Sequence, residues 1–555
     1  MKKTLFLLPA TLLISSMVLG QVDGLDQSFG TNGIVKTSFL TDGYYYSVVN
    51  GLVVQPDQKI ITAGIVSVPY QAVACRYNTD GTLDESFGTN GKSLLATTSL
   101  SYCDAVALKD NGQILLGGTD PNSQFCIMAL DNAGALDATF NSTGISAVAF
   151  GVVDSFPASH INKILVLSDE KILVAGHVIK RYDSFNSKDY FGVARLLADG
   201  TIDNTFGNNG TTIIYGTESA EVLDIVYKRG RNINIRTQSD GKVIVCGTSD
   251  TTFNISGQGY SALVFTTVRL TEDGILDPTF GNNGIIKTFV KSAAGWPDYE
   301  VTDNAPCLHV LGDDKIIVAG FAVTDAGRDF AMVRYNADGS IDNTFGTNGF
   351  VITNPSLSTT LYANDEAHAI HVFDDGRILL AGFGWQPSGS AQYLSAILAM
   401  YTSDGQLDAN FHDDGIKGLS LAAYATYIEA IAIQDDGTIV IGGRSAESNG
   451  GETFSTLARL DASTLTASIE ANFSETKNNF VYPNPNNGDF KIRLNTTKGL
   501  KISVYDTLGQ CCFAKAYSNW NESNKLTLNN LSDGLYVLKM EFDTTVSTCK
   551  FLLQK

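Results

Sequence analysis

Hydrophobic residues in this chain occur in short runs that alternate with turn-forming residues. Near the N-terminus the runs cover 34–39, 47–54, 59–65 and 72–77, and Gly, Asn and Asp separate them. The runs are rich in Val, Ile, Ala and aromatic residues, which is typical of β-strands. Apolar positions with a helical period do not recur along the chain. The pattern predicts an all-β protein.

Three sequence elements recur seven times, about 64 residues apart on average. One is a Leu-Asp-x-x-Phe-Gly-x-x-Gly turn, the next a strand that ends in Gly, and the last a strand that carries Arg. The turn supplies Asp26 and Phe29, Asp84 and Phe87, Asp137 and Phe140, Asp203 and Phe206, Asp277 and Phe280, Asp342 and Phe345, and Asp408 and Phe411. The second element ends at Gly64, Gly118, Gly176, Gly247, Gly320, Gly382 and Gly443. The third carries Arg76, Arg195, Arg269, Arg334 and Arg459, with Ala129 and Met400 in the other two copies.

Each repeat contains four predicted strands, so residues 21–464 predict a seven-bladed β-propeller in which each repeat forms one four-stranded blade. A β-solenoid is the alternative, although its repeats are normally shorter. We expect the recurring Phe to fill space between blades and the recurring Asp to accept backbone N–H bonds in turns. We expect the recurring Arg to pair between blades or to extend along the strand towards solvent. Calcium bound at these Asp turns is an alternative function, and we predict no other cofactor and no metal site.

The two ends of the chain differ from the repeats. Residues 1–20 combine a Lys pair, an apolar run and a cleavage site with small residues, which indicates a cleaved signal peptide. Residues 465–479 form a polar linker. Strand-like runs at 490–494, 500–506, 525–528 and 535–542 predict a small β-sandwich over 480–555. A glycan-binding sandwich is the alternative interpretation of this tail.

Two family resemblances follow from these motifs. Residues 24–464 resemble the delta-60 repeat proteins, although Asn141 and His412 replace Gly in two copies. This resemblance implies a propeller that is secreted or lies at the cell surface. It does not assign an activity to the chain. The tail resembles the type A sorting domain of the type IX secretion system through Tyr482, Pro483, Asn484, Pro485, Gly534 and Tyr536. The second resemblance implies export to the cell surface or medium, with the secretion machinery and its sorting peptidase as partners.

Charge and composition exclude several classes of function. The 555-residue chain has 38 basic and 58 acidic side chains, a net charge of −20, so we exclude a nucleic-acid partner. No apolar run after the leader is long enough to span a membrane, and we expect a monomer. The 8 Cys do not form a recognisable framework, but Cys511 or Cys512 could bridge to Cys549 in the tail. No catalytic motif is present, so we assign no catalytic residue.

Long insertions at 178–190, 216–231, 249–260, 292–304 and 384–393 all fall on one predicted face, which we call the variable face. We place Trp296 and Trp385 in its loops, accompanied by Tyr299 and Tyr393. His309 and His371 occupy matching strand positions in the same sector. These six residues are the candidate ligand-binding residues, since Trp, Tyr and His suit sugar stacking or peptide capture.

The hypothesis is therefore a secreted or cell-surface module that binds glycan or protein without catalysis. The second hypothesis is an extracellular polysaccharide hydrolase or lyase, which would need converging carboxylates such as Asp298 and Glu300 beside Asp365 and Glu366. The third is a structural component of a surface layer.

Overall fold

The computed structural model describes the protein from Gly24 to Leu553 in two compact units, residues 1–466 and 467–555. Not described are residues 1–23, 68–69, 96–99, 151–158, 182–186, 215–232, 256–257, 291–300, 303, 325–326, 356–362, 389–390, 413, 462–479, 483–488, 494–497, 506–510, 520–524, 529–530, 533, 543–544 and 554–555. The signal peptide and linker predictions lie outside the described residues. Among the described residues, no helix is long and apolar enough to cross a membrane.

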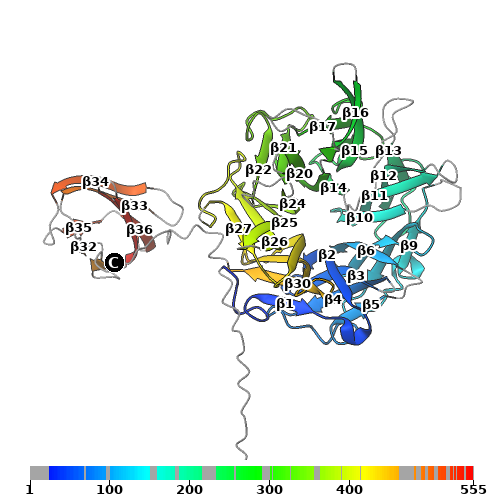
Figure 1. Cartoon of the computed structure of the whole chain (residues 1–555), viewed down its shortest axis with the longest axis horizontal. Coiled ribbons are helices and arrows are strands. Elements are labelled where there is room, and N and C mark those ends of the chain that lie inside the picture. The colour runs from blue at the N-terminus through cyan, green and yellow to red at the C-terminus, as the bar shows by residue number, and fades with distance from the viewer. Residues whose placement is uncertain are drawn as a thin grey trace, which may run out of the picture. The chain divides into compact units, whose positions relative to one another are not determined.

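The first unit is a ring of antiparallel four-strand groups, each with its first strand nearest the centre (Figure 1). In chain order the first three groups are β2 (Tyr46–Val54), β3 (Ile60–Ser67), β4 (Gln71–Tyr77) and β5 (Lys92–Leu94); β6 (Tyr102–Leu108), β7 (Ile114–Thr119), β8 (Phe125–Leu130) and β9 (Ile145–Val148); and β10 (Ser159–Val166), β11 (Ile172–Arg181), β12 (Ser187–Leu196) and β13 (Thr211–Ile214). The next two are β14 (Asn234–Thr237), β15 (Val243–Ile255), β16 (Gln258–Leu270) and β17 (Ile285–Thr288), joined by β18 (Val301–Thr302); and β19 (Asn304–Val310), β20 (Ile316–Thr324), β21 (Gly327–Tyr335) and β22 (Phe350–Thr353), joined by β23 (Ala363–Asn364).

The remaining groups share one twelve-stranded sheet with the first. They are β24 (Glu366–Val372), β25 (Ile378–Ser388), β26 (Ala391–Tyr401) and β27 (Ile416–Leu419); and β28 (Ala425–Ile433), β29 (Ile439–Ala446), β30 (Thr453–Leu460) and β1 (Ile34–Thr37). Short parallel pairings between β26 and β28 and between β30 and β2 join the groups. The predicted all-β propeller is confirmed, while the number of seven separate blades stays a prediction.

The assignment of strands to blades differs from the prediction in one respect. The first strand of each repeat pairs with the last strand of the preceding repeat, as β5 does with β4 and β9 with β8. The prediction that each repeat forms its own blade was therefore wrong by one strand. The physical reason is that the connection between these strands, residues 78–91 between β4 and β5, contains two successive turns and returns the chain antiparallel beside the strand it left, with Tyr77 bridged to Leu83 and the Phe87 N–H bonded to the Asp84 carbonyl. The N-terminal β1 accordingly pairs with β30, the last strand of the ring.

Hydrophobic side chains are buried mainly between neighbouring four-strand groups. One cluster, for example, packs Leu115 and Ile127 of the second group against Ile161 and Val174 of the third. The recurring Phe lies in these interfaces as expected, and Phe87 is fully buried. A Cβ added at Gly134 of the next repeat would come within 2.8 Å of the Phe87 ring. The glycine of the Asp-Gly turn therefore makes room for the Phe of the preceding repeat.

The glycine that ends the second recurring element allows the innermost strand to approach its backbone closely. A Cβ added at Gly64 would lie 1.8 Å from the carbonyl oxygen of Val48 on the innermost strand β2. Next to this contact the register between β2 and β3 shifts, which leaves Asn50 as an extra, bulged residue. Equivalent bulges occur in β6, β10, β24 and β28. The Gly is thus required where the innermost strand bulges.

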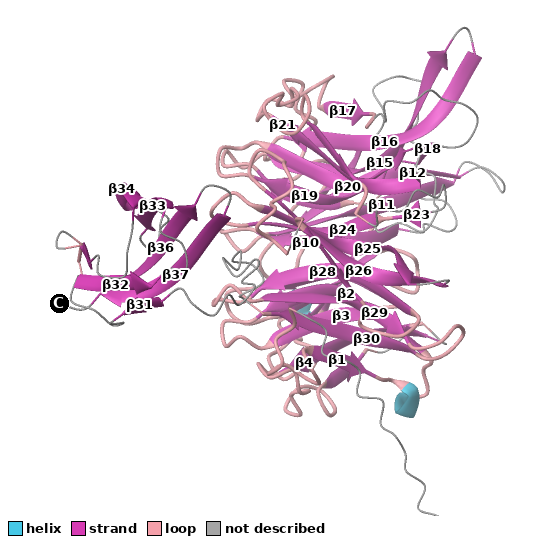
Figure 2. Cartoon of the chain, turned by 60° about the vertical axis from the view of Figure 1, so that its left-hand side comes forward, coloured by secondary structure: helices cyan, strands magenta, loops and turns pink. Residues whose placement is uncertain are grey.

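Three of the predicted insertions form longer hairpins instead of loops. Strands β15 and β16 each have 13 residues and stay paired from Val243–Leu270 to Ile255–Gln258. This hairpin extends away from the ring in Figure 2. The pairs β11–β12 and β25–β26 are lengthened in the same way. The other two insertions lie largely outside the described residues.

The second unit contains two sheets, as the sandwich prediction requires. One consists of β31 (Phe480–Tyr482), β32 (Asp489–Arg493) and β35 (Lys525–Thr527). The other has the order β34 (Cys511–Asn519), β33 (Lys498–Tyr505), β36 (Gly534–Phe542) and β37 (Thr545–Leu553). The core includes Ile502, Leu526, Leu538 and Met540. Of the sorting-motif residues, Tyr482, Gly534 and Tyr536 lie in these strands, and Pro483, Asn484 and Pro485 lie outside the described residues.

The strand order argues against the disulfide considered for the tail. Cys511 and Cys512 belong to β34, and Cys549 belongs to β37, at the opposite edge of the same sheet. Three strand spacings separate these edges by about 14 Å. The Cα atoms of a disulfide lie within about 7 Å of each other. The sheet therefore holds these cysteines too far apart to bridge.

Candidate functional site

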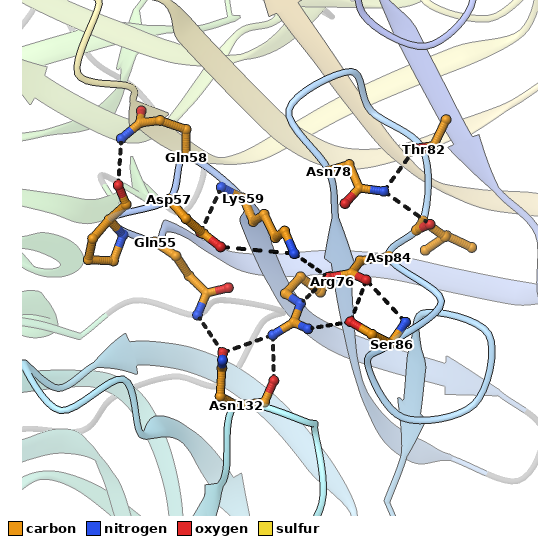
Figure 3. Close-up of polar contacts among 12 residues, drawn as sticks. Gln55, Asp57, Gln58, Lys59, Arg76, Asn78, Thr82, Asp84, Ser86 and Asn132 are labelled. Atoms are coloured by element: carbon orange, nitrogen blue, oxygen red, sulfur yellow. Dashed lines mark hydrogen bonds and ion pairs between the residues drawn. The ribbon is translucent and has the colours of Figure 1, made fainter.

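The recurring Arg forms a clamp between neighbouring four-strand groups (Figure 3). Arg76 Nε donates to Asp84 Oδ2 over 2.8 Å, and its Nη1 donates to the backbone carbonyl and side chain of Asn132 in the next repeat. The guanidinium also lies over the Phe87 ring, 4.9 Å from its centroid. The same contacts recur at Arg195, Arg269, Arg334 and Arg459. The expected inter-blade role of this Arg is confirmed.

The recurring Asp stabilises the turn between two strands. Asp84 Oδ1 accepts hydrogen bonds from the backbone N–H and the hydroxyl of Ser86. Burial raises the pKa of Asp84, but hydrogen bonds from Lys59 and Ser86 and the charge of Arg76 outweigh it and hold the pKa below its usual value. This carboxylate is therefore ionised and occupied by partners within the fold, as a structural role requires.

A different set of side chains lies around the centre of the ring, where the innermost strands begin on the variable face. The bulged residues of these strands are polar: Asn50, Asp104, Asn162, His368 and Glu429. They connect neighbouring groups, since Asn50 Nδ2 donates to Asp104 Oδ1 over 2.7 Å and His368 Nδ1 contacts Glu429 Oε2 at 2.8 Å. Asn50 Oδ1 and both polar side-chain atoms of Asn162 are buried and have no hydrogen-bond partner among the described residues.

Aromatic rings and a contact between a histidine and a carboxylate meet at the start of β6 and β10. Tyr70 and Tyr102 are exposed, and their ring centroids are 5.0 Å apart. Tyr102 also contacts the edge of His160, which stacks on His177 at 5.4 Å. His160 Nε2 lies 2.5 Å from Asp104 Oδ2. Burial, followed by the charge of His160, lowers the pKa of His177 to about 3, so His177 is neutral.

A second cluster begins at β24 and β28. His368 lies between two carboxylates, with Nε2 at 3.3 Å from Glu366 Oε2 and Nδ1 beside Glu429. Burial lowers the pKa of His368, but Glu429 and Glu366 outweigh it and raise the pKa to about 9. Arg328 adds an ion pair to Glu366. At neutral pH this cluster holds a protonated imidazole between two ionised glutamates.

Arg444 lies beside this cluster and lacks a carboxylate partner among the described residues. Its guanidinium is 4.1 Å from the ring centroid of Tyr427 and 5.7 Å from that of Tyr46. Its Nη1 donates to the Tyr46 hydroxyl. Tyr427 in turn contacts Phe383, which packs on His368. The guanidinium is thus held between two tyrosines.

These residues occupy equivalent places in five innermost strands. Tyr46, Tyr102, His160, Glu366 and Tyr427 all lie within the first three residues of β2, β6, β10, β24 and β28. Together with Arg444 and His368 they form a partly exposed set that we call the crown. The crown combines aromatic faces, both signs of charge and hydrogen-bonding groups around the centre of the variable face.

The structure describes only part of the predicted set of ligand-binding residues. Trp296 and Tyr299 lie outside the described residues. Trp385 belongs to strand β25 and pairs with Leu394, so its assignment to a loop was wrong because the insertion lengthens a hairpin. Tyr393 pairs with Gln386 in the same hairpin.

The two predicted histidines lie elsewhere on the innermost strands. His309 pairs with Ile317 and His371 with Leu379, which confirms their matching strand positions. Trp385 is six residues beyond Leu379 on β25, about 20 Å at the usual strand rise. His371 and Trp385 therefore do not share a site.

The carboxylates considered for catalysis are also described only in part, so their convergence stays a prediction. Asp298 and Glu300 lie outside the described residues. Asp365 is fully buried, and its Oδ1 accepts from the backbone N–H of Trp385. Among the described residues there is no group of three or more His, Cys, Asp or Glu that could hold a metal ion. Calcium at the Asp turns stays an untested alternative.

Sequence reasoning missed the crown because its positions are defined by strand register. Tyr46, Tyr102 and His160 each lie shortly before the bulged residue of their strand. The bulge adds one residue between them and the strand positions that pair with the recurring Gly element. A polar residue lies about fourteen positions before five of the recurring Gly residues, and aligning it would have revealed the bulged residues Asn50, Asp104, Asn162, His368 and Glu429 beside the crown, of which His368 is a member.

Comparison with known proteins addresses both units. The secretion system C-terminal sorting domain family matches residues 480–554. A family described as a domain of unknown function (DUF5122) β-propeller matches residues 55–87, 167–206, 238–280, 311–345 and 434–463. No curated protein matches the chain.

Solved structures resemble the chain weakly. A Dyadobacter fermentans protein of unknown function is 8% identical with a TM-score of 0.36, covering 66% of this chain and 98% of its own. Sqt1 of Chaetomium thermophilum is 10% identical with a TM-score of 0.39, covering 76% and 97%. An endo-arabinase of Bacteroides thetaiotaomicron is 12% identical with a TM-score of 0.30, covering 54% and 92%. Similarity at this level carries no functional argument. The two family matches show that the chain is an exported protein that combines a DUF5122 β-propeller region with a type IX secretion sorting domain.

Proposed function

We propose that this secreted propeller is a non-enzymatic binding module that recognises glycans through the crown. The observation that carries the proposal is the cluster of rings formed by the crown residues Tyr102 and His160 with the neighbouring Tyr70, beside the contact between His160 and Asp104. Aromatic faces stack on the C–H faces of sugar rings, and adjacent charged groups bind sugar hydroxyls. Both kinds of group are present here, because the Tyr102 ring contacts His160 and His160 contacts the Asp104 carboxylate.

The charge state of the crown favours binding over acid–base catalysis. Burial raises the pKa of Glu366, but hydrogen bonding and charge from His368 and the charge of Arg328 outweigh it and lower the pKa. A glycosidase needs one carboxylic acid with a raised pKa to protonate the leaving group. Glu366 is ionised, so it is not prepared for that role.

A hydrolase or lyase is the second candidate, because Glu366 and Glu429 converge on the same imidazole of His368. Two carboxylates beside one protonated group could act on a bound polysaccharide once substrate displaced the existing contacts. Turnover of any glycan that binds is therefore the measurement that separates this candidate from a binding module.

A glycan array probed with the full chain tests the proposal. We expect selective binding that falls at least tenfold in Tyr102→Ala and Arg444→Ala, since a stacked ring or charged donor contributes on the order of 1–3 kcal/mol. Tyr424→Ala is the matched control, because Tyr424 is 41% exposed and Tyr102 37% exposed. Equal binding by all variants would contradict the crown as the site. Absence of glycan binding would leave a protein-binding or structural role.

A further inference from the structure

A group of basic side chains lies at the turn-side ends of three consecutive innermost strands, away from the crown. Arg236 of β14 pairs with Ile244, His309 of β19 with Ile317, and His371 of β24 with Leu379. Each partner is the second residue of the neighbouring strand, so the three occupy one register position. The equivalent residues elsewhere in the ring are apolar: Val53, Ala107, Leu165 and Ala432.

Arg236 has an unusual set of partners for an arginine in this protein. Its Nη1 donates to Asn234 Oδ1 over 3.0 Å and to the Ile235 carbonyl over 2.7 Å. Among the described residues, its Nε and Nη2 have no hydrogen-bond partner and no carboxylate pairs with it. By contrast, Arg76 and its four equivalents each pair with an Asp.

The neighbouring histidines are electrostatically linked to Arg236. Burial, then the charges of Arg236 and His371, lower the pKa of His309 to about 4. Burial lowers the pKa of Arg236 as well, and the thiols of Cys246 and Cys307 oppose this shift. Among the described residues, no carboxylate contributes to the pKa shift of Arg236 or of His309.

The other charges near the group do not neutralise it. Lys163 of β10 is close enough to influence the thiol of Cys307 and adds positive charge. Asp374, in the turn after β24, raises the pKa of His371, while burial lowers it by more. A partly buried guanidinium without an anionic partner is costly in a folded protein. An external anion would offset that cost.

We propose that Arg236, His309 and His371 form a binding site for a small oxyanion group, that is a carboxylate, phosphate or sulfate. The planar Nε and Nη2 edge of Arg236 matches two oxygens of such a group. The imidazoles of His309 and His371 supply further N–H donors from the next two strands. The site is independent of the crown and of glycan binding there.

Thermal unfolding and titration calorimetry of the full chain test this site. The probes are inorganic phosphate, sulfate and acetate, each compared with chloride at equal ionic strength. We expect at least one of them to bind and to raise the Tm. Phosphate and sulfate acting without acetate would indicate a tetrahedral ligand, and acetate acting alone would indicate a carboxylate.

Variants identify the residues. We expect Arg236→Gln and His309→Gln each to weaken the binding about tenfold or more, as loss of a charged or buried donor does. Arg377→Gln is the control for net charge, since Arg377 pairs with Asp375 at the surface and should leave binding unchanged. Two results would overturn the proposal: no oxyanion exceeding chloride in the wild type, or an undiminished Tm shift in both Gln variants. His309→Gln keeps the test valid if Arg236→Gln does not fold.

Discussion

The recurring Arg–Asp pair is a buried interaction that is repeated around the ring. In the fifth repeat Arg334 and Asp342 are 9% and 5% exposed, and Arg334 Nη1 also donates to the Ser403 carbonyl over 2.6 Å. We expect Arg334→Ala to destabilise the propeller by on the order of 3 kcal/mol, because it leaves Asp342 buried with one cation fewer. Chemical denaturation measures the loss.

A surface pair provides the control for that substitution. Arg377 and Asp375 are 28% and 53% exposed, so Arg377→Ala should cost less than about 1 kcal/mol. Similar losses in the two variants would mean that burial of the clamp is unimportant.

The protonated His368 makes part of the stability depend on pH. Its pKa is raised to about 9, above the unfolded value near 6.5. Its contribution is therefore complete below about pH 6.5 and is lost as the pH rises through 9. We expect the Tm of the wild type to approach that of His368→Gln over this interval. Parallel Tm curves from pH 6 to 10 would contradict the assigned charge state.

His412 occupies a backbone conformation that five of the other repeats give to Gly and one gives to Asn141. Its φ is +51°, and Gly88 at the equivalent position has φ +56°. A left-handed conformation costs a non-glycine residue about 1–2 kcal/mol. We expect His412→Gly to stabilise the propeller by about 1 kcal/mol in chemical denaturation. His412→Ala, which keeps a Cβ, should give no gain, and a gain from Ala would point to the imidazole instead.

At the scale of elements, the feature that holds the ring together is the pairing of β1 with β30. Residues before β1 extend this contact, since Asp26 N–H donates to the Arg459 carbonyl over 2.9 Å and Arg459 clamps Asp26. The N-terminal segment thus supplies the last strand of the last group.

Removing that segment tests the closure. We expect deletion of residues 21–38 to lower the Tm by roughly 10 °C, because β30 and the Phe29 interface lose their partners together. Deleting residues 251–260 from the β15–β16 hairpin and joining its ends is the control, since these residues extend beyond the four-strand register. A larger effect of the hairpin deletion would contradict closure by β1.

The elements were largely predictable from the sequence, whereas their partners were not. Runs such as 47–54 and 72–77 anticipate β2 and β4 within a residue or two, because each strand is bounded by local turn chemistry. The exchange of the first strand between repeats depends on the connection that contains the Asp-Gly and Phe-Gly turns, which returns each first strand beside the last strand of the preceding repeat. The strands β34 and β37 of the tail were missed because their polar and apolar residues alternate weakly.

At the scale of the whole molecule, repetition explains why the architecture was recognisable and the site was not. Seven copies reinforce the signals for Phe, Asp and Gly, and five copies reinforce that for Arg; all of these residues serve the fold. Residues that differ between copies carry no such reinforcement, and the crown and the basic group consist of those residues. His309 and His371 were found because they align, but Arg236 at the same register lies after an insertion that obscures the alignment.

The pairing of the N-terminal strand with the last group of the ring also has a kinetic consequence. The pairing of β1 with β30 closes a loop of nearly the entire propeller, so its entropic cost is met only after the final repeat is available. Until then β1 has no partner strand, and the exposed edges of the first and last groups can pair with other chains. We therefore expect folding of an emerging chain to finish in one late step, and premature truncation to give aggregation instead of a smaller stable ring.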